Sequence, residues 1–233
     1  MRTHLLTGAG SGIGAAVARR LSERGDRLVL VARSKARVEA LLADFPGSQA
    51  LVADLAEPEA LEVVLASTEL PPALDSVLHI AGVVDLGPVA EAPLAEWREH
   101  LSVNLLAPFL LTRACLPAVR RTQGTVLFVN SSAGLSASAA WGAYAASKFG
   151  LRALADALRS EEIGNGVRVT TVFPSRTATP MQEKVHEQEG GTYDPARWIS
   201  PETVAETILH VLDLPRDATI PEVTVRPVVP RPS

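Results

Sequence analysis

Short apolar runs alternate along the chain with longer segments in which apolar residues recur every three to four positions. The short runs predict buried strands, and the longer segments predict amphipathic helices. We expect strands near residues 3–7, 27–32, 48–53, 75–80, 124–130, 167–173 and 219–226. We expect helices near residues 12–24, 34–44, 58–69, 93–120, 141–163 and 201–214. This alternation predicts an α/β fold in which a parallel sheet carries helices on both faces.

Two segments in the last third of the chain lack this pattern. Residues 181–199 are polar and contain Gly190-Gly191, which predicts a mobile loop, a substrate lid over residues 181–200. Residues 227–233 are rich in proline and predict a loosely held tail. The length of 233 residues suits a single domain, 1–233, rather than two.

The composition narrows the possible partners and the location. The net charge is −4 and the basic residues are dispersed, so we expect no nucleic-acid partner. The apolar stretch 101–119 is interrupted by polar residues and prolines, so we expect no membrane span. Cys115 is the only cysteine and the five histidines are not paired at ligand spacing, which argues against a metal site. The first residues lack the features of a signal peptide, so we expect a cytoplasmic location.

The first predicted strand runs directly into a glycine-rich turn. Glycines in a turn between a strand and a helix let the backbone approach a pyrophosphate, and the helix start offers free N–H groups. A glycine cluster can be only a structural turn, but its position between the first strand and the first helix favours a dinucleotide. No Gly-Lys-Ser/Thr follows, which excludes a nucleotide-triphosphatase loop. The residues expected to bind the cofactor here are Gly8, Gly10, Ser11, Gly12, Ile13 and Gly14.

The end of the second predicted strand distinguishes between the two nicotinamide dinucleotides. NAD-binding turns place an acidic residue about 20 positions further on, where it holds the ribose 2′-hydroxyl. Here the strand ends in Ala32-Arg33-Ser34-Lys35, without a carboxylate. A guanidinium favours a cofactor that carries a 2′-phosphate, so Arg33 predicts NADP(H) over NAD(H). The alternative is that Arg33 is an ordinary exposed charge at a strand end.

A tyrosine and a lysine stand one helical turn apart in the predicted helix 141–163. Tyr144 and Lys148 lie on one face of that helix. A nearby ammonium favours the phenolate of a tyrosine, so this pair could exchange a proton with a substrate oxygen. Taken alone, this spacing is usually structural. However, the predicted strand 124–130 ends in Ser131-Ser132, which a parallel sheet would deliver to the ligand crevice.

In their order and spacing these motifs resemble the short-chain dehydrogenase/reductase family over nearly the whole chain. The further matching positions are Asp54-Leu55, Ala81-Gly82, Asn104, and Pro174 through Thr179. The resemblance implies a single Rossmann-like domain with a doubly wound parallel sheet of about seven strands. It also implies that the predicted helices 93–120 and 141–163 pair across a two-fold axis in a homodimer or homotetramer.

The resemblance implies a role for each catalytic position. Tyr144 would be the proton donor or acceptor, and Lys148 would lower the pKa of Tyr144 and bind the nicotinamide ribose. Ser131 would hydrogen-bond the substrate oxygen, and Asn104 would anchor a water that relays protons through Lys148. Ser131 is expected here rather than Ser132, because it stands 13 positions before Tyr144.

The resemblance also implies the remaining cofactor contacts. Asp54 and Leu55 would border the adenine, and Thr179 would hold the carboxamide. The sequence departs from the family pattern at two of these places. The usual Asn-Asn-Ala-Gly is His79-Ile80-Ala81-Gly82 here, and the usual Pro-Gly is Pro174-Ser175. The amide side chain that normally braces the sheet near the cofactor is therefore absent.

The sequence thus predicts an NADP(H)-dependent oxidoreductase that moves a hydride between the nicotinamide and a carbonyl or secondary alcohol of a small organic substrate. One alternative is a catalytically silent regulatory protein that binds the dinucleotide on the same fold. A serine hydrolase is disfavoured, because no position reads Gly-x-Ser-x-Gly. Trp141 and Leu135 could line the substrate site or belong to the core, and His186 is expected to face solvent.

Overall fold

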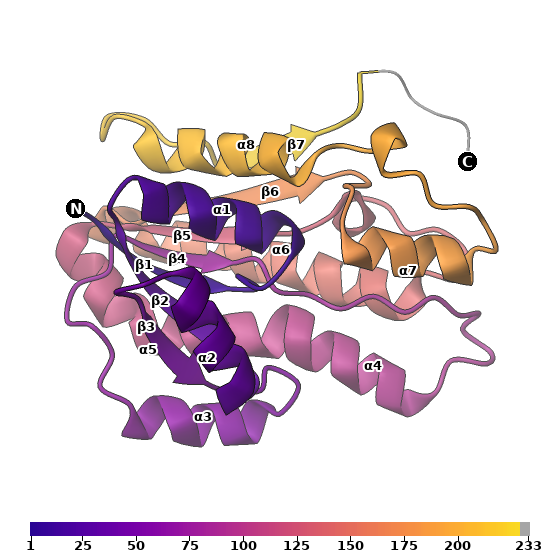
Figure 1. Ribbon diagram of the computed structural model, residues 1–233, viewed down its shortest axis with the longest axis horizontal. Helices are drawn as coiled ribbons and strands as arrows, with labels where there is room; N and C mark the ends of the chain where they lie inside the picture. The colour runs from indigo at the N-terminus through magenta and orange to yellow at the C-terminus, as the bar shows by residue number, and fades with distance from the viewer. Residues whose placement is uncertain (229–233) are drawn as a thin grey trace.

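Parallel strands form a single sheet in the computed structural model, which describes residues 1–228 (Figure 1). The order across the sheet is β3-β2-β1-β4-β5-β6-β7, and every neighbouring pair is parallel. The bounds are β1 Thr3–Thr7, β2 Arg27–Ala32, β3 Gln49–Val52, β4 Ser76–His79, β5 Thr125–Val129, β6 Arg168–Pro174 and β7 Glu222–Val225. The strand ends agree with the predicted ends to within one residue, except that β7 starts three residues late. The parallel order confirms the predicted doubly wound sheet.

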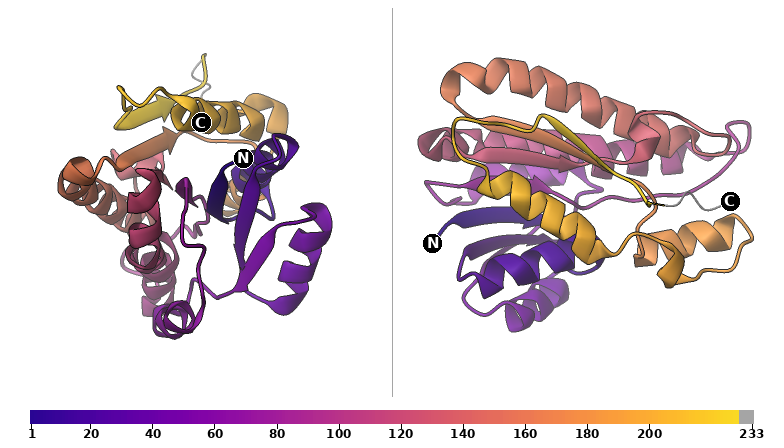
Figure 2. Two further views of the ribbon diagram at one scale, coloured as in Figure 1. Left: turned by 90° about the vertical axis from the view of Figure 1, so that its left-hand side faces the viewer. Right: turned by 90° about the horizontal axis from the view of Figure 1, so that it is seen from above.

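Helices cover both faces of this sheet (Figure 2). Their bounds are α1 Gly12–Glu23, α2 Lys35–Asp44, α3 Pro58–Ser67, α4 Leu94–Leu101, α5 Ala107–Thr122, α6 Gly142–Glu162, α7 Pro180–Gln188 and α8 Pro201–Asp213. A π-helical segment, Ser102–Leu106, joins α4 to α5. The single helix predicted at 93–120 is therefore two α-helices in one continuous helical stretch. The other predicted helices are present within two residues of their predicted ends.

Helix α7 corrects the prediction of a mobile loop for residues 181–188, whereas residues 189–194 form no helix and the role of 181–200 as a substrate lid stays a prediction. Thr179 caps the helix by accepting a hydrogen bond from the amide of Gln182, and Pro180 occupies its first turn. His186 was expected to face solvent, which is wrong. Its side chain is buried, and its ring lies 5.0 Å from that of Trp198. The predicted tail falls mostly on residues 229–233, which lie outside the described residues.

Alternate residues of each central strand serve two separate cores. In β1, Leu5 packs with α3, α5 and α6, whereas Leu6 packs with α1, α2 and α8 on the other face. Val77 and Leu78 divide β4 in the same way. Strands that are buried on both faces have nearly continuous apolar sequences, which explains why the sequence pattern identified them.

The stretch that runs through α4 and α5 is the most apolar helical part of the chain. By length and composition alone, Leu94–Thr122 could cross a membrane. However, 61% of its most apolar window is buried inside the fold, where Leu111 and Val119 belong to the core. Packing against the sheet accounts for this composition, so the helix is weak evidence for a membrane span. The absence of a membrane partner stays a prediction.

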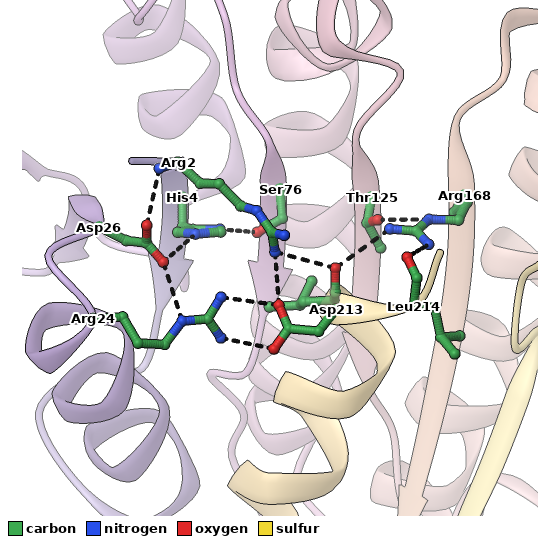
Figure 3. Close-up of polar contacts among 10 residues, drawn as sticks. Arg2, His4, Arg24, Asp26, Ser76, Thr125, Arg168, Asp213 and Leu214 are labelled. Carbon is green, nitrogen blue, oxygen red and sulfur yellow. Dashed lines mark hydrogen bonds and ion pairs between the residues drawn. The ribbon is translucent and has the colours of Figure 1, made fainter. Parts of the chain in front are cut away.

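A network of charged side chains lies at the amino end of the sheet (Figure 3). Asp213, at the end of α8, accepts hydrogen bonds from Arg2 at 2.8 Å and from both terminal nitrogens of Arg24 at 2.9 and 3.0 Å. His4 is buried beside Asp26, with 3.4 Å between His4 Nε2 and the carboxylate. Burial lowers the pKa of His4, although Asp26 opposes the shift. This network ties α1 and α8 to the sheet at the end opposite to the carboxyl ends of the strands.

Candidate functional site

A cavity of about 660 Å³ opens at the carboxyl ends of the strands, around the place where the chain order reverses between β1 and β4. This is the position at which doubly wound folds bind ligands. The predicted site residues that line the cavity are Gly8, Ser11, Gly12, Ile13, Gly14, Ala81, Gly82, Ser131, Tyr144, Lys148, Pro174 and Thr179. The predicted residues that do not line it are Gly10, Arg33, Asp54, Leu55 and Asn104.

The glycine turn leaves room for a ligand because it has no side chains. A Cβ atom on Gly14 would lie 2.0 Å from the carbonyl oxygen of Gly8, so α1 starts too close to the turn for any other residue. Gly8 itself has a φ of +80°, and a Cβ there would lie 2.9 Å from the amide of Ala81. Ser11 precedes α1 without forming a capping hydrogen bond to a described residue. The first N–H groups of α1 thus remain available to an anion, as a bound pyrophosphate requires.

A threonine hydroxyl braces the edge of the sheet where the family pattern has an amide side chain. Thr7 Oγ1 accepts hydrogen bonds from the amides of Ile80 and Ala81, both at 3.1 Å. His79 points instead into the core, where its Nε2 lies 2.8 Å from Thr112 Oγ1. The two amides that follow β4 thus bind the hydroxyl of the last residue of β1 and hold the ends of these two strands together.

Helix α6 carries Tyr144 and Lys148 into the cavity on one face. Both side chains are buried, and Lys148 Nζ lies 5.7 Å from the centroid of the Tyr144 ring. The ammonium donates a hydrogen bond of 3.1 Å to the Val129 carbonyl at the end of β5. Burial lowers the pKa of Lys148 to about 8.

The pKa of Tyr144 does not shift in the direction implied by the family resemblance. Burial raises the pKa of this phenol, and a hydrogen bond with Ser131 only partly opposes the shift. Lys148 directs its ammonium to the Val129 carbonyl, and it is not among the groups that shift the pKa of Tyr144. The Tyr144 hydroxyl is accordingly a proton donor in the state that the structure describes.

The end of β5 sets the position of Ser131. Its hydroxyl accepts a hydrogen bond of 3.1 Å from the amide of Ala133. The same hydroxyl is a hydrogen-bond partner of the Tyr144 phenol. Ser132 also lines the cavity, but it begins a short 3-10 turn.

Sequence reasoning missed Asn130, the last buried residue before these serines. Its Nδ2 donates to the Lys148 carbonyl at 2.9 Å and so fastens β5 to α6.

Asn104 lies beneath the cavity in the π-helical segment. Its Nδ2 donates to the Val83 carbonyl at 3.0 Å and to Ser147 Oγ at 2.9 Å, and its Oδ1 accepts from the Val83 amide at 2.9 Å. A Cβ atom on Gly82 would lie 3.1 Å from Asn104 Oδ1 and 3.6 Å from Lys148 Nζ. The structure therefore brings Asn104 close to Lys148, although the asparagine is fully buried.

The positions expected to contact the adenine half follow β2 and β3, outside the cavity. Arg33 is exposed directly after β2, and Asp54 is exposed after β3, next to the partly buried Leu55. Sequence reasoning missed Arg37, in the first turn of α2. Its guanidinium lies against the glycine turn, 2.7 Å from the place where a Cβ on Gly10 would stand. Neither arginine side chain forms an ion pair with a described residue.

Helix α7 and the start of α6 form the outer wall of the cavity. Thr179, before α7, lies against the glycine turn, and its Cγ2 is 2.9 Å from the place of a Cβ on Gly12. Trp141 lines the cavity and packs edge-on against Tyr144, whereas Leu135 is not part of the lining. Val185 of α7 belongs to the same small apolar cluster as Tyr144. Within residues 1–228, no cluster of His, Cys, Asp or Glu could hold a metal ion.

Similarities to known proteins extend over the same elements. Residues 2–190 match the short chain dehydrogenase family. Dehydrogenase/reductase SDR family member 11 from Bos taurus is 30% identical and covers 97% of this chain and 96% of its own length. A glycine betaine reductase from Emericella nidulans is 32% identical over 96% of this chain, which spans 18% of that protein.

Two solved structures share the fold over nearly their whole length. An alcohol dehydrogenase from the archaeon Thermococcus sibiricus, complexed with 5-hydroxy-NADP, superposes with a TM-score of 0.86 and is 27% identical. The superposition covers 100% of this chain and 99% of that one. A serine dehydrogenase complexed with NADP+ superposes with a TM-score of 0.85 at 25% identity, covering 97% and 95% of the two chains.

Proposed function

Since this chain belongs to the short chain dehydrogenase family of oxidoreductases, we propose that it is an NADP(H)-dependent enzyme acting on a carbonyl or secondary alcohol of a small organic substrate. The observation that carries this proposal is the meeting of Tyr144, Ser131 and Lys148 in one cavity with the glycine turn. The bound nicotinamide would supply or accept the hydride.

The side chains of this cavity account for the movement of the proton. In reduction, the Tyr144 hydroxyl donates its proton to the developing alkoxide, while Ser131 holds that oxygen by a hydrogen bond. Lys148, whose pKa is about 8, is mostly charged at neutral pH and stabilises the phenolate that remains. Oxidation of an alcohol uses the same groups in reverse. We assign Asn104 the positioning of a water that returns protons through Lys148.

The proposed cofactor site extends from the cavity along the carboxyl edge of the sheet. The glycine turn and the start of α1 would hold the pyrophosphate, and Lys148 would hold the nicotinamide ribose. Asp54 and Leu55 would border the adenine, and Thr179 would hold the carboxamide. The remaining contacts to the nicotinamide half would come from Ala81, Gly82 and Pro174.

Two observations support NADP(H) over NAD(H). Arg33 follows β2 where NAD-binding proteins carry an acidic residue, and Arg37 lies against the glycine turn nearby. Both guanidinium groups are exposed and could bind a 2′-phosphate. In addition, the two solved relatives described above were complexed with NADP+ or a hydroxylated NADP.

Oxidation of NADPH in the presence of small aldehydes and ketones tests the proposal directly. We expect absorbance at the NADPH band to fall with at least one carbonyl compound and to stay constant without substrate. A regulatory protein would bind NADPH without consuming it under any of these conditions. No observation on the described residues favours that alternative. A cytoplasmic location and a homo-oligomeric state stay predictions from the sequence.

A further inference from the structure

Arg176 lies at the outer wall of the cavity, two residues beyond β6. Its guanidinium carbon is 6.0 Å from the centroid of the Trp141 ring and 5.5 Å from that of Trp198. Trp141 packs against Tyr144, with 5.7 Å between the ring centroids. A single indole therefore separates the guanidinium from the phenol that is proposed to donate the proton.

Arg176 stands apart from the groups that would bind the phosphates of the cofactor. Strand β6 is three strands away from β1 in the sheet. At the usual spacing of neighbouring strands this is roughly 14 Å. The guanidinium of Arg176 lies beside Trp141, which packs against Tyr144, and so belongs to the substrate end of the cavity.

The charged side chains that line the cavity are all basic. They are Lys148, Arg176, Arg197 and Arg226, and no aspartate or glutamate among the described residues lines it. Arg197 follows α7 and Arg226 follows β7, and neither forms an ion pair with another described residue. A recess that is lined by one sign of charge raises the local concentration of ligands with the opposite sign. The lining therefore favours anionic ligands, which include the dinucleotide and also a substrate that carries a negative charge.

A carboxylate from the chain itself already binds Arg176. Glu189 accepts one hydrogen bond from Nη1 and one from Nη2, both at 2.6 Å. This parallel pair is the two-pronged geometry with which arginine binds carboxylates. Both side chains remain about one third exposed, so that water and small ions can reach the pair. The arginine is thus already oriented to bind a carboxylate group.

The position of Glu189 allows its carboxylate to separate from Arg176. It is the C-cap residue of α7, where the helix dipole disfavours a negative charge. Gly190-Gly191 follows it, and a Cβ on Gly190 would meet no atom within 4 Å. Helix α7 has a separate anchor, because Lys184 and Gln188 contact Asp85 at 2.6 and 2.9 Å. Glu189 could therefore swing away while these contacts with Asp85 keep α7 in place.

We propose that Arg176 binds a carboxylate of the substrate, and that Glu189 occupies this position until the substrate displaces it. The inference rests on the proposed function and names its substrate class, which is oxo acids and the corresponding hydroxy acids. Exchange of one carboxylate for another preserves the charge and both hydrogen bonds of Arg176. The displaced Glu189 returns to solvent.

Matched pairs of oxo acids and their methyl esters test this inference. The pairs are pyruvate, acetoacetate and levulinate with their esters, and the readout is the ratio of kcat/KM for acid over ester with NADPH. We expect wild type to favour the acid of at least one pair. Arg176→Gln should lower that ratio about 10- to 100-fold, because charge-assisted hydrogen bonds are lost. Glu189→Gln should raise it about two- to five-fold, because an internal competitor is removed.

The opposite signs of these two effects separate the inference from a purely structural ion pair. If the pair only holds α7 in place, both variants change acid and ester alike and leave the ratio constant, which would overturn the inference. A wild-type preference for the esters would overturn it as well. Arg20→Gln is the matched control, because it breaks the remote surface pair with Glu206 at 3.0 Å and should not alter the ratio.

A binding measurement keeps the inference testable apart from turnover. The proposed function is tested by turnover of the wider set of small aldehydes and ketones, whereas binding of an oxo acid can be measured without any turnover. Levulinate added to the enzyme should still change the tryptophan fluorescence in a saturable way, since Trp141 and Trp198 flank Arg176. The change should disappear in Arg176→Gln. Absence of a saturable change in wild type would overturn the inference independently of the chemistry.

Discussion

Lys148 is the residue whose protonation controls the proposed chemistry. Burial lowers the pKa of its ammonium to about 8, so the charged form is lost as the pH rises through this value. The phenol of Tyr144 stays protonated there, because burial raises its pKa above the ordinary value near 10. We therefore predict that kcat/KM for carbonyl reduction falls above about pH 8. A profile that stays flat to pH 10 would contradict this assignment.

Arg33 is the residue expected to distinguish the two dinucleotides. Arg33→Asp removes the guanidinium and restores the carboxylate typical of NAD-binding strands. We predict that the ratio of kcat/KM for NADPH over NADH falls by at least about 10-fold, because a charge-assisted contact to the 2′-phosphate is lost. Steady-state kinetics with both cofactors measure this ratio. An unchanged ratio, or a wild-type preference for NADH, would show that Arg33 is an ordinary surface charge.

The site residues that could be predicted from sequence are those whose geometry follows from local spacing. Tyr144 and Lys148 are four positions apart on one helix, so their common face needed no tertiary information. Asn130 and Arg37 could not be predicted. Asn130 contacts the Lys148 carbonyl, and Arg37 contacts the glycine turn. Both contacts arise only when separate elements pack together.

At the scale of elements, the strands were easy to identify and α7 was not. The central strands are buried on both faces, so their apolar runs stand out in the sequence. Helix α7 buries little apolar surface, and Val185 is its only residue in an apolar cluster of the described chain. Thr179-Pro180 was the available signal, a capping residue followed by proline at the start of a helix.

Asp85 is the contact that holds α7 over the cavity, through Lys184 and Gln188. We predict that Asp85→Ala increases amide hydrogen exchange in α7 a few-fold, in line with the modest strength of exposed ion pairs. Asp213→Ala is the control, because it breaks the network at the opposite end of the sheet and should leave exchange in α7 unchanged. Equal exchange in wild type and Asp85→Ala would show that other contacts position the helix.

The stability of the whole molecule depends on pH through the buried ring of His79. Burial lowers the pKa of His79 to about 3, and its Nδ1 has no hydrogen-bond partner among the described residues. The unfolded chain binds a proton near pH 6.5, whereas the folded chain does not until about pH 3. The contribution of His79 to stability is therefore complete above about pH 6.5 and is lost as the pH falls towards 3, by about 1.4 kcal/mol per pH unit.

Replacement of His79 tests this linkage. His79→Gln removes the titrating ring and retains a group that can hydrogen-bond to Thr112. We predict that the free energy of unfolding of the variant falls less steeply between pH 6 and 4. The difference in slope should correspond to about one proton fewer taken up on unfolding, which is about 1.4 kcal/mol per pH unit. Urea unfolding at several pH values gives both slopes. Parallel slopes would mean that His79 is protonated in the folded protein.

The central claim for the whole enzyme is that one buried phenol transfers the proton. Tyr144→Phe removes only the hydroxyl and keeps the ring that packs with Trp141 and Val185. We predict that kcat/KM for carbonyl reduction falls by about 10²- to 10⁴-fold, while the Kd for NADPH stays close to that of wild type. Wild-type turnover by Tyr144→Phe would contradict the account.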